Sequence, residues 1–315
     1  MKKVAVYGVG NLGMEILKGL SKRGVKLNKF SYNKPGAKEK KLNLNGQDVR
    51  IVNSYYLKEQ AHKEDIKKHV SYIVVTVTGK VLEKDIDLLL SLKTPLIILS
   101  TQYDVEMIRN KAINAGISVV MSENMAFGIV DFWNKLDKIP KVPDNFRVIL
   151  QVIESNPYYK EDISGSAIIG ANKFKLKGVE VNFSEEQRKR YKPDIDGDYG
   201  CIRSERDEIT QEMSGVPVEY IDSHAYHSFF LNILEDESDV KTYLKKLYFL
   251  LKPLEVHTIP GILEFEVNLF ENSLDITHNI NGRDIYTEGV LKSIDFLESQ
   301  EDVGVFTGLD VIGVK

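Results

Sequence analysis

The stretch that most constrains the fold lies at the start of the chain. Residues 3–7 (KVAVY) form a short apolar run, and the glycine-rich turn GVGNLG over residues 8–13 separates it from a stretch with helical spacing. Strand, glycine turn and helix in this order are the context of a dinucleotide-binding fingerprint. In that motif Gly8 allows the tight turn, Gly10 lets the backbone approach a pyrophosphate, and Gly13 packs the helix on the strand. The phosphates would bind the free N–H groups at the start of the helix.

The polar end of the second expected strand bears on the choice of cofactor. The glycine turn at residues 8–13 could also be a turn without a ligand, but the strand and helix around that turn favour a bound cofactor. Residues 26–32 (KLNKFSY) end where a carboxylate would bind the ribose of NAD, and no acidic residue is present there. Hydroxyl, amide and lysine side chains suit a 2′-phosphate better than two bare hydroxyl groups. We therefore expect NADPH or NADH, with a preference for NADPH, bound in part by Ser31, Asn33 and Lys34.

Strand and helix patterns continue to alternate through the first half of the chain. Residues 72–79, 95–101 and 117–124 are nearly continuous apolar runs, which is typical of parallel strands buried on both faces. The pattern predicts an α/β fold with a Rossmann-type, doubly wound parallel sheet. Ligands bind such sheets at the carboxyl ends of the strands. The polar or small residues expected there are Thr78, Gly79, Ser100, Thr101, Gln102 and Asn124.

The second half of the chain has a different pattern. A strand over 146–155, a short helix after a Ser-Gly-Ser turn, and an apparent hairpin through LEFEVNLFE and LDITHNI predict an α+β substrate domain with an open, largely antiparallel sheet. We expect a dinucleotide-binding domain over 1–127, with 286–315 packing back on it, and a substrate-binding and oligomerisation domain over 128–285. An inserted amphipathic helix with an acidic start is expected near 231–256, with a structural role.

Composition narrows the class of protein. Hydrophobic residues make up 43% of the chain and charged residues 28%, as in ordinary soluble domains. The net charge of −4 argues against nucleic acid as the main partner. No apolar stretch is long enough to span a membrane, and the single cysteine, Cys201, excludes an intrachain disulfide. We expect a cytoplasmic protein, and no metal, because no cluster of His, Cys, Asp and Glu has metal-ligand spacing.

The stretch KEDISGSA, residues 160–167, could bind an anion. Ser164, Gly165 and Ser166 present hydroxyl and consecutive N–H groups at a helix start. Lys160 could bind the same anion or donate a proton, with Asp162 capping the helix or orienting the lysine. Further along, Arg283 could clamp a carboxylate with two hydrogen bonds. The alternative is a serine-capped helix, a surface lysine and an arginine in a salt bridge, and these residues alone do not decide between the two.

An ordered series of motifs carries a family resemblance. The series comprises the fingerprint at 8–13, LSTQYD, SENMAFG, ESNPYYKEDISGSA, GVPVEYIDSHAYHS, ITHNINGRDIYTEGVLKSIDFL and GVFTGLDVI. In this order it resembles the 4-hydroxy-tetrahydrodipicolinate (dihydrodipicolinate) reductases of the diaminopimelate route to lysine. The similarity is greatest to the branch found in plants and some bacteria. The motifs span both halves of the chain, with 231–256 as the unmatched insertion.

The resemblance implies hydride transfer from a nicotinamide to a cyclic, conjugated imine dicarboxylate, in a homotetramer. Lys160 matches the family's proton-donating lysine. Gly165 and Ser166 match its substrate-carboxylate turn, with Ser164 beside them, and Arg283 matches an arginine that faces the same pocket. The residues that match its cofactor contacts are Gly8, Val9, Gly10, Asn11, Leu12, Gly13, Ser100, Thr101, Gln102, Glu123, Asn124, Met125 and Ala126.

One departure from the family pattern affects the chemistry. Asn156 stands where the family has its catalytic histidine, and Pro157 follows where the branch has a polar residue that would face the substrate. An amide can hydrogen-bond the substrate, but it cannot exchange a proton near neutral pH. Losing a general acid typically costs about 10²–10⁴-fold in rate. A slower reductase that relies on Lys160, Tyr158 or Tyr159 is one interpretation. A different imine or amino acid substrate, or a non-catalytic nucleotide-binding regulatory protein, are the others.

The histidines are candidates to replace the missing imidazole. His224 and His227 could reach the pocket, and His278 could be a core residue with a satisfied ring. A polar, charged stretch holds two more, which we expect to be solvated: His62 and His69. For His257, nothing in the surrounding sequence suggests chemistry.

Overall fold

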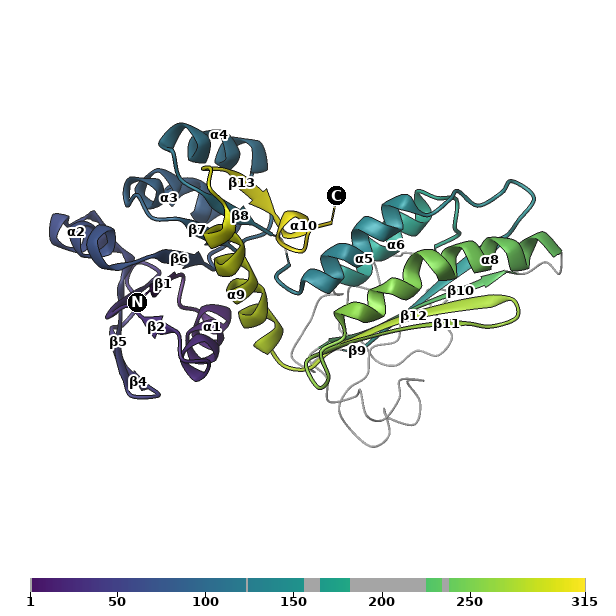
Figure 1. The fold of residues 1–315 in the computed structure, drawn as a ribbon, viewed down its shortest axis with the longest axis horizontal. Coiled ribbons are helices and arrows are strands. Elements are labelled where there is room, and N and C mark those ends of the chain that lie inside the picture. The colour runs from purple at the N-terminus through teal and green to yellow at the C-terminus, as the bar shows by residue number, and fades with distance from the viewer. Residues whose placement is uncertain (1, 123, 156–164, 182–224, 234–237, 315) are drawn as a thin grey trace. The chain divides into compact units, whose positions relative to one another are not determined.

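The computed structural model describes residues 2–122, 124–155, 165–181, 225–233 and 238–314. The chain divides into two compact units: Met1–Phe127 together with Tyr286–Lys315, and Gly128–Ile285. Each unit is built around its own sheet (Figure 1). The assignment of the dinucleotide to the first unit and of the substrate to the second stays a prediction.

The first unit contains a nine-stranded sheet. The strands follow the order β13-β8-β7-β6-β1-β3-β5-β4, with β2 paired to β1, and all neighbours are parallel except β4 and β5. The strands are β1 (Lys3–Tyr7), β2 (Lys26–Leu27), β3 (Phe30–Asn33), β4 (Lys40–Leu44), β5 (Gln47–Asn53), β6 (Tyr72–Val75), β7 (Leu96–Ile98), β8 (Val119–Met121) and β13 (Val305–Thr307).

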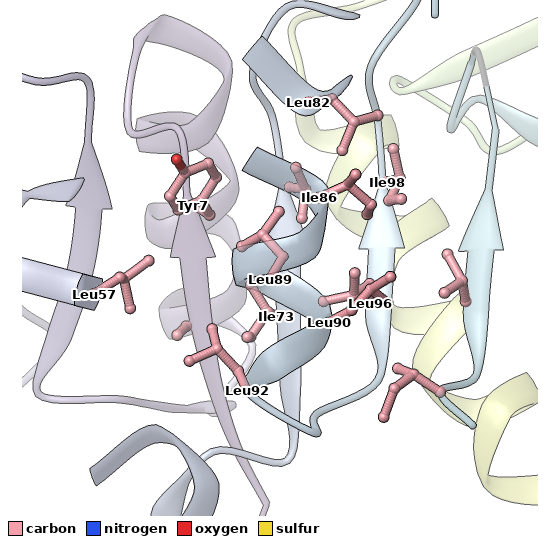
Figure 2. Packing of buried hydrophobic residues seen from close by; sticks show 14 of the residues in the cluster. Tyr7, Leu57, Ile73, Leu82, Ile86, Leu89, Leu90, Leu92, Leu96 and Ile98 are labelled. Carbon is pink, nitrogen blue, oxygen red and sulfur yellow. The ribbon is translucent and has the colours of Figure 1, made fainter. Parts of the chain in front are cut away.

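Helices cover both faces of this sheet. Figure 2 shows Leu82, Ile86 and Leu89 of α3 beside the strands that carry Ile73 and Ile98. On the opposite face α1 meets α9, and the central strands are buried along most of their length, as expected for a doubly wound sheet. The helices are α1 (Asn11–Lys22), η1 (Ser54–Lys58), α2 (Gln60–His69), α3 (Gly79–Ser91), α4 (Val105–Ala115), α9 (Asp284–Ser299) and α10 (Gly308–Val311).

Two features of the first sheet differ from the sequence expectation. The expected second strand is two strands, β2 and β3, because the chain shifts at Asn28, whose N–H donates to the Val4 carbonyl at 2.8 Å. The β4–β5 hairpin was not expected at all. Its turn is Asn45-Gly46, with φ angles of 46° and 78°, the left-handed pair that a two-residue hairpin turn requires. The Asn-Gly signal was present in the sequence.

The second unit contains a four-stranded antiparallel sheet with the order β11-β12-β10-β9. Helices α5, α6 and α8 lie along one face of it (Figure 1). The expected hairpin is confirmed as β11–β12, and the fold class is confirmed for both units. The elements are α5 (Phe127–Lys138), β9 (Val148–Ser155), α6 (Gly165–Lys175), β10 (Ala225–Ile233), α8 (Ser238–Leu251), η4 (Lys252–His257), β11 (Leu263–Leu269) and β12 (Ser273–Ile280).

The inserted segment is not a single helix. Its first residues, 231–233, belong to β10, and the helix α8 starts only at Ser238 and passes into the 3-10 helix η4. β10 pairs with both β9 and β12, so it is a central strand. Tyr226, His227, Ser228 and Phe229 are all buried, on both faces of the strand. A strand buried on both faces lacks the alternation that identifies a half-exposed strand, which explains why the sequence pattern did not reveal it.

The described ranges contain no helix with the length and apolar character needed to cross a membrane. Over the same ranges, no group of three or more His, Cys, Asp and Glu side chains is placed to hold a metal ion.

Candidate functional site

The glycine turn after β1 is tightly packed at two of its three glycines. Gly8 has φ +103°, and a Cβ there would lie 2.7 Å from Val77 Cγ1. Its N–H donates to the Tyr32 carbonyl at 2.8 Å, and its carbonyl accepts a 2.7 Å hydrogen bond from the Thr76 hydroxyl. A Cβ on Gly13 would lie 2.6 Å from the Gly8 carbonyl oxygen. Helix α1 therefore packs directly on the turn. The hydrogen bond from the Thr76 hydroxyl also fixes the turn, and the sequence patterns did not predict this bond.

Gly10, by contrast, faces open space. It is exposed, its φ of −87° is accessible to any residue, and a Cβ there would meet only the Gly8 carbonyl, at 4.0 Å. Gly10 is the N-cap of α1, no side chain caps the helix, and no acidic residue lies in its first turn. The helix start thus combines uncapped N–H groups with an unobstructed approach, as an anion requires. Ligand contacts of residues 8–13 stay a prediction.

The loops after β6 and β7 abut at the same edge of the sheet. A Cβ on Gly79, the first residue of α3, would lie 2.5 Å from the Thr101 carbonyl oxygen and closer still to that of Gln102. Gln102 itself has a left-handed φ of +58°. Thr78, Thr101 and Gln102 are exposed, whereas Ser100 is buried. Among the described residues the Ser100 hydroxyl has no hydrogen-bond partner.

Of Ser31, Asn33 and Lys34, the three residues expected to bind the 2′-phosphate, not all present their side chains at the carboxyl edge of the sheet. Ser31 is 0% exposed, and its hydroxyl accepts the Val6 N–H at 3.2 Å. We therefore correct the expectation for Ser31: its side chain bonds the sheet backbone instead of facing a ligand. Asn33 ends β3, and its side-chain oxygen accepts the Lys34 N–H at 2.8 Å. Lys34 is exposed, so the group at this strand end reduces to Asn33 and Lys34.

The turn before α5 is closed by its own hydrogen bonds. The Asn124 side-chain oxygen accepts the Ala126 N–H at 2.8 Å, and the Ser122 hydroxyl donates to the Asn124 carbonyl at 2.7 Å. Met125 and Ala126 are buried, so only their backbone could contact a cofactor. Glu123 lies outside the described residues.

Most of the expected catalytic stretch also lies outside the described residues: Asn156, Pro157, Tyr158, Tyr159, Lys160, Asp162, Ser164 and His224. Their roles stay predictions. Gly165 begins α6, and Ser166 is half-buried in the first turn of that helix. Arg283 is half-buried in the loop before α9. Its guanidinium makes no ion pair with any part of the chain that the structure describes, so the salt-bridge alternative for Arg283 finds no partner there.

Two of the histidines lie in the core of the second unit. His227 on β10 and His278 on β12 are paired in register, with ring centroids 4.6 Å apart, and are 1% and 0% exposed. His227 does not face solvent: it shares its side of β10 with Phe229, which packs against Phe132 of α5. That His227 reaches the pocket stays a prediction. His278 is a core residue, but its ring nitrogens have no hydrogen-bond partner among the described residues. Burial, and then the neighbouring His227, hold the pKa of His278 well below its usual value.

Of the two histidines expected to be solvated, one corrects the expectation and the other meets it. His62 is half-buried, with its ring 4.8 Å from that of Phe30 and 5.1 Å from that of Tyr56, so it packs against aromatic rings instead of being solvated. His69 is exposed, as expected.

His257 has a strong partner, although its sequence surroundings suggested none. Its Nε2 lies 2.9 Å from Oδ2 of Asp131, a buried carboxylate on α5. Burial raises the pKa of Asp131. The hydrogen bond with His257 and the charge of Lys135 more than offset this, and the pKa lies below its usual value. The two partners are far apart in the sequence, which is why no local pattern pointed to the pair.

Comparison with known proteins shows which enzymes the chain resembles. No protein-family model matches the chain. A 4-hydroxy-tetrahydrodipicolinate reductase from Arabidopsis thaliana is 24% identical over 310 residues, covering 96% of this chain and 75% of the relative. A probable reductase of the same name from Oryza sativa is 22% identical, covering 94% of this chain and 72% of the relative. The chain resembles these reductases along nearly its whole length.

The solved structures agree with this resemblance at the level of fold. A dihydrodipicolinate reductase from Paenisporosarcina sp. TG-14, solved with dipicolinate, superposes with a TM-score of 0.57 over 99% of each chain, at 14% identity. At that identity the match shows the fold alone. The sequence relatives confirm the reductase resemblance carried by the ordered motifs, whereas the replacement of the family histidine by Asn156 is not tested by either comparison.

Proposed function

We propose that this chain is an NAD(P)H-dependent oxidoreductase, a 4-hydroxy-tetrahydrodipicolinate reductase of lysine biosynthesis through diaminopimelate. One observation carries the proposal. A chain related to these reductases over 96% of its length also has the open, uncapped helix start at Gly10 that a dinucleotide requires. Its substrate would be a small, cyclic imine dicarboxylate.

The first unit fits a nicotinamide dinucleotide. The start of α1 offers uncapped N–H groups and room beside Gly10 for a pyrophosphate. The Ser100 hydroxyl, buried without a partner among the described residues, and the exposed Thr101 and Gln102 lie at the same carboxyl edge of the sheet. When bound, the cofactor supplies the hydride. The chain's own residues bind and orient it at this edge.

We further propose that the cofactor is NADPH in preference to NADH. Lys34 is exposed at the end of β3 beside Asn33, where a 2′-phosphate would lie in a sheet of this type. No carboxylate follows the strand to bind a free 2′-hydroxyl. An exposed ammonium group at this position favours the doubly charged phosphate.

On the substrate side, the proposal assigns proton delivery to Lys160 and carboxylate binding to Ser164, Gly165, Ser166 and Arg283. Hydride addition to the ring must be balanced by a proton on the neighbouring atom, and an ammonium group can give it. Asn156 and Pro157 would then only hydrogen-bond or line the pocket. The guanidinium of Arg283 finds no carboxylate partner in the described ranges, which leaves it available for a substrate carboxylate.

The experiment follows the loss of near-ultraviolet absorbance of NADPH, and then of NADH, with the substrate generated in situ. The natural protein is compared with Asn156→His and with Lys160→Ala. Turnover by the natural protein that is lost in Lys160→Ala supports the proposal. Cofactor binding without turnover in the natural protein and in Asn156→His would refute the lysine-pathway assignment.

Asn156 favours a second candidate, a reductase of the same fold that acts on another imine or amino acid substrate. Turnover only in Asn156→His would favour this candidate, because the pocket would be preserved while the natural reaction differed. We also propose a homo-oligomer, with a tetramer as the expected state, and a cytoplasmic location. Sedimentation and cell fractionation would test these two.

A further inference from the structure

The strand order of the first sheet gives the dinucleotide a direction along the carboxyl edge. β1, β3 and β5 are parallel neighbours in that order, and Asn33 at the end of β3 is paired with Asn53 at the end of β5. Neighbouring strands lie about 4.8 Å apart. The pyrophosphate proposed at Gly10 follows β1, and the 2′-phosphate proposed at Lys34 follows β3. In the same direction along the edge, the next loop is the one that follows β5.

That loop is the 3-10 helix η1, and its spacing decides which side chains face outward. In a 3-10 helix the residues i and i+3 lie on the same side. Ser54 and Leu57 are buried, and Leu57 belongs to the hydrophobic cluster shown in Figure 2. Tyr55 and Lys58, each one position further along, are exposed. The helix is therefore anchored through one side and presents a tyrosine and a lysine on another.

The exposed ring of Tyr55 is held in place although it is not buried. The Tyr55 N–H donates to the side-chain oxygen of Asn53 at 2.9 Å, which caps η1 and fixes the backbone. Nζ of Lys58 lies over the Tyr55 ring, 5.6 Å from its centroid, where the ring attracts a cation. The exposed fraction of Tyr55 is still 57%. The ring is thus ordered on one face and accessible to a ligand on the rest of its surface.

The neighbouring Tyr56 differs from Tyr55 in its contacts. Tyr56 is half-buried, and its ring centroid lies 5.1 Å from that of His62. Its hydroxyl donates to the carboxylate of Glu39, which also pairs with Arg50 at 3.1 Å. These contacts explain Tyr56 as a structural residue, whereas more than half of Tyr55 stays in contact with solvent.

We propose that Tyr55 stacks on the adenine ring of the bound dinucleotide. The adenine is attached to the ribose that carries the 2′-phosphate, so a phosphate bound at Lys34 brings the base to the loop after the adjacent strand β5. The flat, exposed face of a tyrosine suits a nucleic acid base, and the ammonium group of Lys58 lies on the other face. The inference rests on the proposed dinucleotide cofactor and adds the residue that binds its base.

The test measures the binding of two ligands by titration calorimetry. NADPH and 2′-phospho-ADP-ribose share the adenine end, but only NADPH carries the nicotinamide. Tyr55→Ala should weaken the binding of both ligands by the same factor, at least about fivefold, because both lose the stacking contact. Tyr55→Phe keeps the ring and should bind both ligands like the natural protein.

A matched control separates stacking from a general effect on the unit. Ile113→Ala shortens another exposed apolar side chain of the first unit, which is 54% exposed, and should change neither affinity. The thermal unfolding temperature should be the same in Tyr55→Ala and the natural protein, since the removed ring is exposed. A lower unfolding temperature together with weaker binding would assign Tyr55 a structural role and overturn the proposal.

The remaining outcomes distinguish this inference from the proposed function. Unchanged affinities in Tyr55→Ala would overturn the stacking alone, and so would a loss confined to NADPH, because the contact would then involve the nicotinamide end. A natural protein that binds NADPH but not 2′-phospho-ADP-ribose would also overturn it. If both affinities depend on Tyr55 while the lysine-pathway substrate is not reduced, the stacking stands and the proposed reaction fails.

Discussion

The rings of His227 and His278 lie 4.6 Å apart in the core of the second unit, each on its own strand and both nearly inaccessible to solvent. Neither ring nitrogen of His278 has a hydrogen-bond partner among the described residues. A second positive charge beside an already buried imidazole is costly, so this pair favours the neutral form of His278. The pair links the stability of the second unit to pH.

Stability should fall in mildly acidic solution. The pKa of His278 in the folded protein lies well below its usual value of 6.5, so the unfolded chain binds this proton more readily. The free energy of unfolding is therefore unaffected by His278 well above pH 6.5 and falls below it, by up to about 1.4 kcal/mol per pH unit. Urea unfolding between pH 5 and 8 measures this. His278→Phe should flatten the dependence of the free energy of unfolding on pH. The control His69→Asn, at an exposed histidine, should leave this dependence unchanged. An unchanged pH dependence in His278→Phe would contradict the role given to His278.

Gly10 and Gly13 should respond differently to the same substitution. In Gly10→Ala the new methyl meets open space, so unfolding should be unchanged while dinucleotide affinity falls at least about tenfold, because the methyl intrudes on the phosphate approach. In Gly13→Ala the methyl meets the Gly8 carbonyl, and we expect a loss of about 1–3 kcal/mol in stability. Thermal unfolding and fluorescence titration with NADPH separate the two effects. Equal affinity in Gly10→Ala and the natural protein would place the phosphates elsewhere.

Gly79→Ala tests the contact between the loops after β6 and β7. A methyl group on Gly79 would overlap backbone carbonyls at Thr101 and Gln102, which cannot move aside as a side chain could. We expect a loss of stability of at least about 2 kcal/mol and weaker cofactor binding in the fraction that folds. Lys80→Ala, at the exposed next position, is the control and should change neither. A stable Gly79→Ala protein would show that these loops are free to separate.

Cofactor choice should depend on Lys34 and not on Ser31. Lys34→Glu should raise the KM for NADPH about tenfold or more and change that for NADH little, because only NADPH carries the 2′-phosphate. Ser31→Ala should leave the ratio of the two constants unchanged. It should cost about 1 kcal/mol in stability, since the buried Val6 N–H loses its acceptor. An unchanged NADPH preference in Lys34→Glu would remove this residue from the site.

Opening the Asp131–His257 pair should destabilise the second unit. Among the described residues, His257→Leu leaves the buried Asp131 carboxylate with only Lys135, at 3.7 Å, as an ionic partner. We expect a loss of about 2 kcal/mol near pH 7, less than for a fully unpaired buried charge. Asp131→Asn/His257→Leu, which removes the charge as well, should recover part of the loss. Chemical denaturation of the single and double variants checks this, and equal losses in both would mean that packing alone is responsible.

Local sequence signals predicted the parts of the fold that depend on local structure. The strand, turn and helix over 3–22 could be identified because a left-handed φ at Gly8 and tight packing at Gly13 favour glycine at those positions. The β11–β12 hairpin and α9 follow from their own periodicity. The reductase resemblance rests on the order of such local motifs, and the sequence relatives agree with it over 96% of the chain.

The candidate site was predicted only in part, and for a physical reason. The exposed Lys34 and the open Gly10 could be named from the ends of strand patterns, whereas the burial of Ser31 depends on the pairing of β1 with β3. The roles of Asn156 and Lys160 were inferred from the motif alone and stay predictions.

By itself the sequence determined the alternation of elements, the glycine turn and the family resemblance, because each depends on residues that are neighbours in the sequence. Only the tertiary structure decided that β10 is a central strand, that His227 and His62 are packed instead of solvent-facing, and that Asp131 pairs with His257. These outcomes depend on contacts between residues far apart along the chain. The spacing of neighbouring residues does not predict such contacts.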